Sequence, residues 1–180
     1  EPLKGMHVVV DAGNGAGGTA GAVRNISGNN TLTGVVTLGA GGARINSDAG
    51  LLTLSGANIT GATQLLTVGG AGNTTISKVI ATTTGTLTKD GAGTLSLAGA
   101  NTYTGATNVN AGTLATSGGA IPNASAVTVA GSATLSVNAA EVIGSLDGAG
   151  NVTLNAALTA GANGSSTIFS GVMSGVADFT

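Results

Sequence analysis

The sequence predicts an all-β protein built as a parallel β-helix, in which short strands stack turn upon turn along one axis. Two observations carry this prediction. Residues 85–114 contain three short strands with leucine or valine at alternate positions, separated by turns rich in glycine and asparagine. The motif at residues 55–63 also returns at 98–107, offset by 43 residues at its start and by 44 at its end. Self-similarity at a fixed spacing of this kind is typical of a solenoid.

Alternation of apolar and small polar residues predicts strands, because a period of two places the apolar set on one face. No window shows helical spacing without an interrupting glycine, so we expect almost no helix. Strands are expected at residues 31–33, 35–38, 51–54, 65–68, 74–77, 86–88, 94–97, 108–110, 127–129, 134–137 and 151–154.

The repeat spacing predicts the length of one turn. A second similarity at longer range pairs residues 66–70 with 158–162 and residues 77–80 with 170–173, at offsets of 92 and 93. Taking 43 residues as two turns and 92 as four gives roughly 20 to 24 residues per turn and about seven or eight turns. Asn58 and Asn101 then occupy equivalent positions, and we expect their amides to stack as a ladder at a corner. An antiparallel sandwich or barrel is the alternative, but the regular offset and the shortness of the strands favour the parallel coil.

Composition excludes several classes of protein. Charged residues make up 7% of the 180 residues, and the five lysines and arginines are scattered, so we expect no nucleic-acid partner. Cysteine is absent, which excludes disulfides, zinc–thiolate sites and thiol nucleophiles. No apolar run is long enough for a membrane-spanning helix. No secretion signal is recognisable either, so we expect any export signal to lie outside this chain.

The stretch LTKDGAGTLSLAGANTYTGATNVNAGTL, residues 87–114, resembles the passenger-associated repeat of bacterial autotransporters. Residues 141–154 and 166–175 fit the same pattern, so the resemblance spans about 21–180. It implies a right-handed parallel β-helix on the surface of a Gram-negative bacterium, serving as a stalk or adhesive passenger. The membrane barrel of that family is missing from this chain, so the region 21–180 is interpreted as C-terminally truncated.

Residues 1–20 form an atypical N-terminal segment, interpreted as a fusion junction or a cap strand. Its glycine cluster Gly13–Gly18 matches a dinucleotide fingerprint but lacks the helix that must follow. Residues 1–18 also resemble the start of the second domain of the phosphoglucomutase and phosphomannomutase family. The phosphoserine loop and the Asp-Gly-Asp metal loop of that family occur nowhere in the sequence, so no catalytic residue is carried over.

We expect no catalytic residue, cofactor or metal site. His7 is the only histidine and has no matching serine motif for a catalytic triad. Asp90 and Asp147 precede glycines and are interpreted as turn formers, without the oxygen cluster that calcium needs. Tyr103 is interpreted either as a packing plug between turns or as a contact for a ligand such as a sugar.

The predicted function is therefore structural or adhesive, outside the cell, with a host or matrix glycan or protein as partner. The alternative is a self-assembling extracellular fibre subunit whose coil ends stack through their strand edges. A carbohydrate-active enzyme would need paired carboxylates, for which Glu141 and Asp147 are the nearest candidates. An ice-binding protein would need a flat hydroxyl array, for which the candidates are Thr31 with Thr33 and Thr86 with Thr88.

Overall fold

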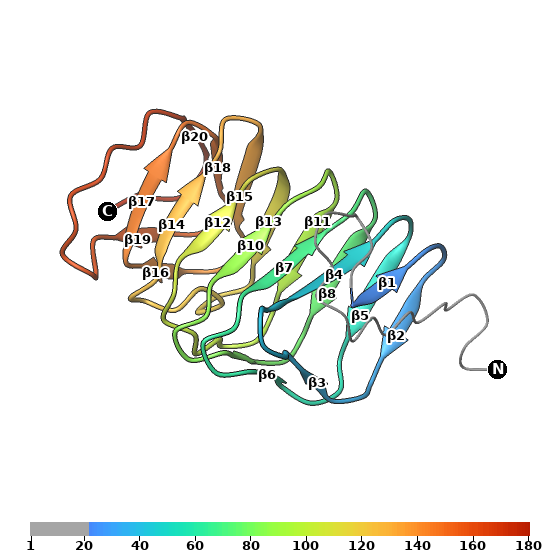
Figure 1. The fold of residues 1–180 in the computed structure, drawn as a ribbon. Helices are drawn as coiled ribbons and strands as arrows, with labels where there is room; N and C mark the ends of the chain where they lie inside the picture. The colour runs from blue at the N-terminus through green and yellow to red at the C-terminus, as the bar shows by residue number, and fades with distance from the viewer. Residues whose placement is uncertain (1–21) are drawn as a thin grey trace.

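The computed structural model describes residues 22–180, which form a parallel β-helix of about seven turns (Figure 1). Every strand pair runs parallel, and none of these residues is helical. The predicted fold class is thereby confirmed, and the right hand of the coil stays a prediction. The atypical segment 1–20, with His7 and Gly13–Gly18, lies outside the described residues.

Two long sheets form two sides of the coil. The seven-stranded sheet contains, in spatial order, β1 (Val23–Asn25), β4 (Ala43–Ser47), β7 (Leu66–Gly69), β10 (Leu87–Lys89), β12 (Thr107–Val109), β14 (Ala126–Val129) and β17 (Ser145–Gly148). The eight-stranded sheet contains β2 (Asn30–Leu32), β5 (Leu51–Leu54), β8 (Asn73–Ile76), β11 (Thr94–Leu97), β13 (Gly112–Thr116), β15 (Ala133–Val137), β18 (Asn151–Leu154) and β20 (Val172–Gly175).

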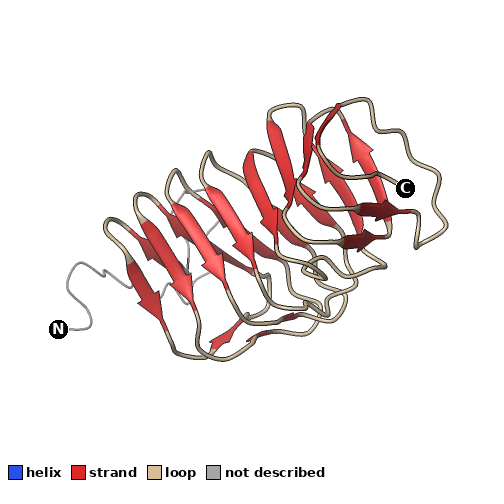
Figure 2. Ribbon diagram, turned by 180° about the vertical axis from the view of Figure 1, so that it is seen from behind, coloured by secondary structure: helices blue, strands red, loops and turns tan. Residues whose placement is uncertain are grey.

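The third side of the coil is interrupted. Its first part pairs β3 (Val36–Thr37), β6 (Ile59–Thr60) and β9 (Ile80–Ala81), and its last part pairs β16 (Glu141–Ile143) with β19 (Leu158–Ala160). Between β9 and β16 the chain passes this side twice as irregular loop, as the tan segments of Figure 2 show. The backbone groups of these two passages therefore need partners other than a strand ladder.

The core is a set of apolar rows that run along the inside of the coil. In the eight-stranded sheet the strand register stacks a row that faces inward on every turn: Leu52, Thr74, Leu95, Leu114, Leu135 and Val152. All of these side chains are buried. Because each turn covers the apolar face of the one before it, no single turn encloses a core of its own.

The shorter repeat is confirmed as two turns. Ser55, Ser77 and Ala98 donate successive backbone hydrogen bonds to Leu32, Leu54 and Ile76, so Ser55 and Ala98 lie two turns apart. The interpretation of the longer-range similarity as four turns was wrong, because Leu66 lies in the seven-stranded sheet whereas Leu158 lies on the third side. The cause is a change in turn length: strand partners are 23 residues apart at Ala43 and Leu66, but only 17 at Thr134 and Asn151.

Several strands lack the alternation that would have predicted them. In β4 the inward positions include polar Ser47 beside Ile45, the outward Asn46 is buried as well, and β13 begins with a glycine. Within residues 22–180 there is no helix that could cross a membrane.

Truncating an inward leucine should destabilise the coil far more than changing its outward neighbour. We expect Leu95→Ala to lower the free energy of unfolding by about 2–5 kcal/mol, because Leu95 is fully buried and its removal leaves a cavity. The matched control is Ser96→Ala, the next residue along β11, for which a change within about 0.5 kcal/mol is expected. Urea unfolding followed by circular dichroism measures both. Equal losses in the two variants would contradict the inward and outward assignment.

Candidate functional site

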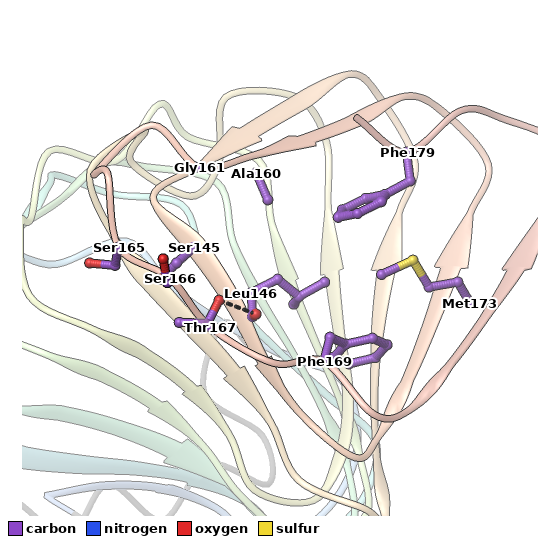
Figure 3. A pocket seen from close by; sticks show the side chains of 10 residues that line it. All are labelled: Ser145, Leu146, Ala160, Gly161, Ser165, Ser166, Thr167, Phe169, Met173 and Phe179. Carbon is purple, nitrogen blue, oxygen red and sulfur yellow. Dashed lines mark hydrogen bonds between the residues drawn. The ribbon is translucent and has the colours of Figure 1, made fainter.

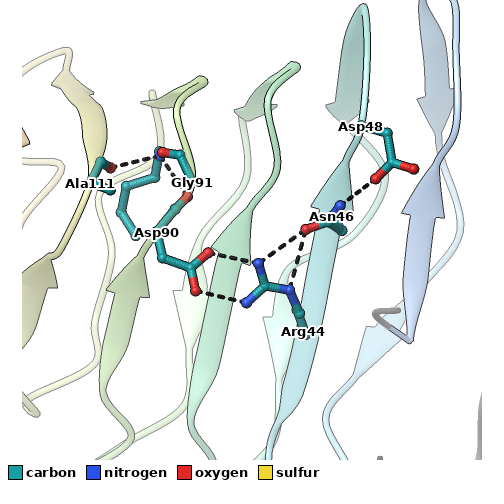
Figure 4. Close-up of polar contacts among 7 residues, drawn as sticks. Arg44, Asn46, Asp48, Asp90, Gly91 and Ala111 are labelled. Carbon is teal, nitrogen blue, oxygen red and sulfur yellow. Dashed lines mark hydrogen bonds and ion pairs between the residues drawn. The ribbon is translucent and has the colours of Figure 1, made fainter. Parts of the chain in front are cut away.

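The most unusual group in the coil is a lysine inside it. Lys89 ends β10 and stands in an inward-facing row between Val68 and Val109 on the neighbouring turns. Its side chain is 2% exposed, and Nζ donates hydrogen bonds to three carbonyl oxygens: Asp90 at 2.8 Å, Gly91 at 2.7 Å and Ala111 at 3.0 Å (Figure 4). These carbonyls belong to two successive corners, so the ammonium group ties one turn to the next.

Burial lowers the pKa of Lys89 to about 8, and the nearby carboxylate of Asp90 opposes this shift. An ammonium group taken out of water is stable only when its three donors find acceptors, and the three carbonyls provide them.

Asn101 joins three turns on the interrupted third side. Its Oδ1 accepts the backbone N–H of Ile80 at 2.7 Å, and its Nδ2 donates to the backbone oxygen of Ala120 at 2.6 Å. Asn58 accepts the N–H of Val79 at 3.2 Å. The expected amide ladder does not form, because Asn58 and Asn101 are two turns apart and each binds the backbone of the turn between them.

Glu141 binds the interrupted third side from the turn that follows it. It is 2% exposed, and its two carboxylate oxygens accept the backbone N–H groups of Ala120 and Ile121, each at 3.2 Å. Burial raises the pKa of Glu141, and the two N–H donors oppose that shift. Lys89, Asn101 and Glu141 thus bind backbone groups of adjacent turns, and we call them the three bridging side chains.

Tyr103 is fully buried and heads a short chain of hydroxyl groups. Its Oη lies 2.8 Å from Thr107 Oγ1, which lies 2.9 Å from Ser125 Oγ, and Ser125 donates to the carbonyl of Gly105 at 2.8 Å. Because the Ser125 proton goes to that carbonyl, Thr107 must donate to Ser125 and Tyr103 to Thr107. The Tyr103 ring therefore packs between turns, where an external ligand meets it only if the coil opens.

The outer face of the seven-stranded sheet carries an ion pair that spans two turns. Arg44 binds Asp90 through its two terminal guanidinium nitrogens, at 2.8 and 2.7 Å, although β7 lies between their strands (Figure 4). Gly69 makes this possible, since a Cβ atom at that position would overlap both Asp90 Oδ1 and the Arg44 guanidinium. Arg24 pairs with Asp48 on the same face and lowers the pKa of that carboxyl.

The outer face of the eight-stranded sheet is uncharged. The strand register aligns one row of small residues along it: Thr31, Thr53, Thr75, Ser96, Ala115, Ser136, Thr153 and Ser174. The second row is equally free of charge: Leu51, Asn73, Thr94, Thr113, Thr134, Asn151 and Val172. On this face, hydroxyl and amide groups rather than charges therefore interact with water.

The two carboxylates considered for an enzyme do not meet. Glu141 points into the core from β16, whereas Asp147 lies exposed on β17. The threonine pairs considered for ice binding are also separated, because Thr31 belongs to the eight-stranded sheet and Thr88 to the seven-stranded one. Among residues 22–180 no three histidine, cysteine, aspartate or glutamate side chains gather as a metal site.

Sequence reasoning missed Lys89 and Glu141 as inward residues, because charged side chains normally face water. One signal was available for Lys89. It follows Leu87 at the inward spacing of two, and continuing that alternation would have placed it inside.

The buried carboxyl of Glu141 should make the coil less stable as pH rises. Its folded-state pKa is raised, so its contribution is complete below the unfolded value of about 4.3 and is lost as pH rises through the folded value. We expect Glu141→Gln to flatten the fall in unfolding free energy that the wild type shows as pH rises above about 4. Asp147→Asn controls for the loss of one carboxyl. Parallel pH profiles for the wild type and Glu141→Gln would contradict the assignment.

Lys89 should change the stability of the coil at alkaline pH, and in the direction opposite to Glu141: stability should rise with pH. Its folded-state pKa of about 8 lies below the unfolded value of about 10.4, so the unfolded chain binds more protons between them. The wild type should therefore gain stability relative to Lys89→Met as pH rises from about 8 to 10. Lys78→Met, at an exposed lysine, is the matched control. A stability difference that stays constant over this range would show that the ammonium group is not buried.

Comparison with known families identifies the central part of the coil. Residues 87–115 match the Passenger-associated-transport-repeat. This segment forms slightly more than one turn, from β10 to β13, and contains Lys89, Asn101 and Tyr103. Comparisons with curated proteins and with solved structures gave no match. The chain is thus a parallel β-solenoid that carries the Passenger-associated-transport-repeat, which indicates an autotransporter passenger β-helix.

Proposed function

We propose that the protein is a non-catalytic stalk segment of an autotransporter passenger, displayed on the bacterial surface. The observation that carries this proposal is the transport repeat in the middle of an unbroken coil. A stalk must transmit position and force along its length without folding or unfolding locally. Stacked parallel strands suit this task, because each turn is hydrogen-bonded to the next along the axis.

The bridging side chains support a mechanical role. The side chains of Lys89, Asn101 and Glu141 hydrogen-bond to backbone groups of adjacent turns, and all three are nearly inaccessible to solvent. Polar groups that serve the fold in this way are not available to a substrate. The positions of Asn101 and Glu141 help to explain how a coil with an interrupted third side stays continuous.

The outer faces support an interfacial role for the same stalk. The uncharged rows of the eight-stranded sheet present hydroxyl and amide groups, which can hydrogen-bond to a neutral glycan or to a protein surface. The seven-stranded sheet instead carries charges, which Arg44 pairs with Asp90 and Arg24 pairs with Asp48, while Asp147 on β17 is exposed. A host or matrix glycan or protein is therefore the partner that we propose for the uncharged face.

Lysine labelling on intact cells tests location and fold together. Within residues 22–180 the lysines are Lys78, which is exposed, and Lys89, which is 2% exposed. We expect a membrane-impermeant amine reagent, applied to intact cells that produce the protein, to label Lys78 and to leave Lys89 unmodified. Peptide mass spectrometry reads both sites.

The control is the same reagent applied after unfolding in urea, which should label both lysines. Labelling of Lys78 only after cell lysis would overturn the proposed surface location. Equal labelling of Lys78 and Lys89 in the folded protein would instead overturn the buried position of Lys89.

A further inference from the structure

We propose that the protein is N-glycosylated at Asn58 and Asn73, whose side-chain amides accept a sugar from a phosphate-activated donor. The inference does not depend on the proposed stalk function, because it requires only that the chain meets an enzyme which transfers sugars to asparagine. It rests on the acceptor tripeptide Asn-X-Ser/Thr and on the contacts that the fold gives each asparagine.

The acceptor tripeptide recurs along the chain. It begins at Asn25, Asn29, Asn58, Asn73, Asn123, Asn151 and Asn163, and its middle residue is never proline. A chain rich in threonine and serine produces such tripeptides by chance, so the motif alone selects no site. The structure does select, because a modified asparagine must be exposed and the fold must not need its Nδ2 atom.

The side chain of Asn58 meets both conditions. It is exposed immediately before β6, and its Oδ1 accepts the backbone N–H of Val79 on the next turn at 3.2 Å. This bond uses the carbonyl oxygen, and among residues 22–180 the Nδ2 atom has no hydrogen-bond partner. Thr60, the third residue of the tripeptide, is exposed as well, because the buried Ile59 between them points inward. The acceptor amide and the hydroxyl group therefore lie on the same side of the chain.

Asn73 repeats this geometry on the outer face of the eight-stranded sheet. It begins β8 and is exposed, and its Oδ1 accepts the backbone N–H of Thr94 at 2.9 Å. Thr75 faces the same way, because the buried Thr74 between them points inward. No other described residue accepts a hydrogen bond from the Nδ2 of Asn73, so this nitrogen too is available.

Asn25 shows what the fold excludes. It begins an acceptor tripeptide but is 1% exposed. Its Nδ2 donates to the backbone oxygens of Gly28 and Ala49 and to the hydroxyl of Ser47, at 3.0 to 3.2 Å. A sugar on that nitrogen would have to break these bonds inside the coil.

Asn101 provides the contrast at the corner that corresponds to Asn58 two turns earlier. There the Nδ2 atom is occupied, because it donates to the backbone oxygen of Ala120 at 2.6 Å. The tripeptide is also absent, because the third residue is the buried Tyr103. Of these two equivalent corners, only the one with a free amide nitrogen carries the acceptor sequence.

The transfer changes only the free nitrogen. Nδ2 attacks C1 of the donor sugar, so that an N–C1 bond forms and the C1–O bond to the phosphate breaks. The phosphate leaves with the bonding electron pair, and one amide proton passes to a base of the transferase. The product keeps its amide carbonyl oxygen, so the hydrogen bonds from Val79 and Thr94 persist. The folded coil therefore tolerates a sugar at both positions.

Mass spectrometry of the protein isolated from the cells that naturally produce it tests the proposal. Tryptic cleavage places both sites on the peptide 45–78 and places Asn25 on the peptide 25–44. We expect Asn58 and Asn73 each to carry the mass of one or more sugar residues, located by electron-transfer fragmentation, and Asn25 to carry none. Absence of sugar from either proposed asparagine would overturn the assignment of that residue. A sugar on Asn25 of the folded protein would overturn selection by burial.

Substitutions at the third residue of the tripeptide distinguish sequence-directed transfer from chance modification. We expect Thr60→Ala to remove the sugar from Asn58 and to leave Asn73 modified, whereas Thr60→Ser should keep both sugars. The reciprocal variant Thr75→Ala should lose the sugar at Asn73 alone. Circular dichroism checks that each variant folds. A sugar that persists on Asn58 in Thr60→Ala would overturn the proposal, as would sugars attached only to threonine or serine.

Discussion

Every turn of this coil depends on its neighbours for its backbone hydrogen bonds. On the two long sides the strand ladders satisfy the N–H and C=O groups, and apolar burial then adds most of the stabilisation. On the third side the ladder stops after β9 and returns at β16. There a few backbone hydrogen bonds still join the turns, from Thr102 to Ile80 and from Thr104 to Thr83, and Asn101 and Glu141 supply further acceptors and a donor from their side chains.

This arrangement explains why a coil made of near-identical turns contains buried polar groups. Rows of leucine and valine stack almost equally well in several registers, since each turn offers the next a similar apolar face. A buried ammonium or carboxylate group has few acceptable partners, and leaving it unpaired is costly. Lys89, Asn101 and Glu141 each bind named backbone groups of an adjacent turn, so they favour one register over its neighbours.

The same constraint separates the inside of the molecule from its faces. Because the polar groups of the core are occupied by the backbone, contact with other molecules falls to the outer faces of the sheets. The two faces differ in kind: one carries the ion pair that Arg44 and Asp90 form across Gly69, and the other carries no charge along two rows.

The sequence by itself determined the fold class, the near absence of helix and the length of a typical turn, because alternation and a 43-residue repeat depend only on local spacing. The tertiary structure alone decided which charged residues turn inward, since Lys89 needs Ala111 as its third acceptor and Glu141 needs the N–H groups of residues 120 and 121, all about 20 residues away. It also decided that one late turn shortens to 17 residues, which separates Leu66 from Leu158. The local sequence pattern shows which residues alternate along one strand. The pairing of one turn with the next depends on contacts between turns, which no single turn contains.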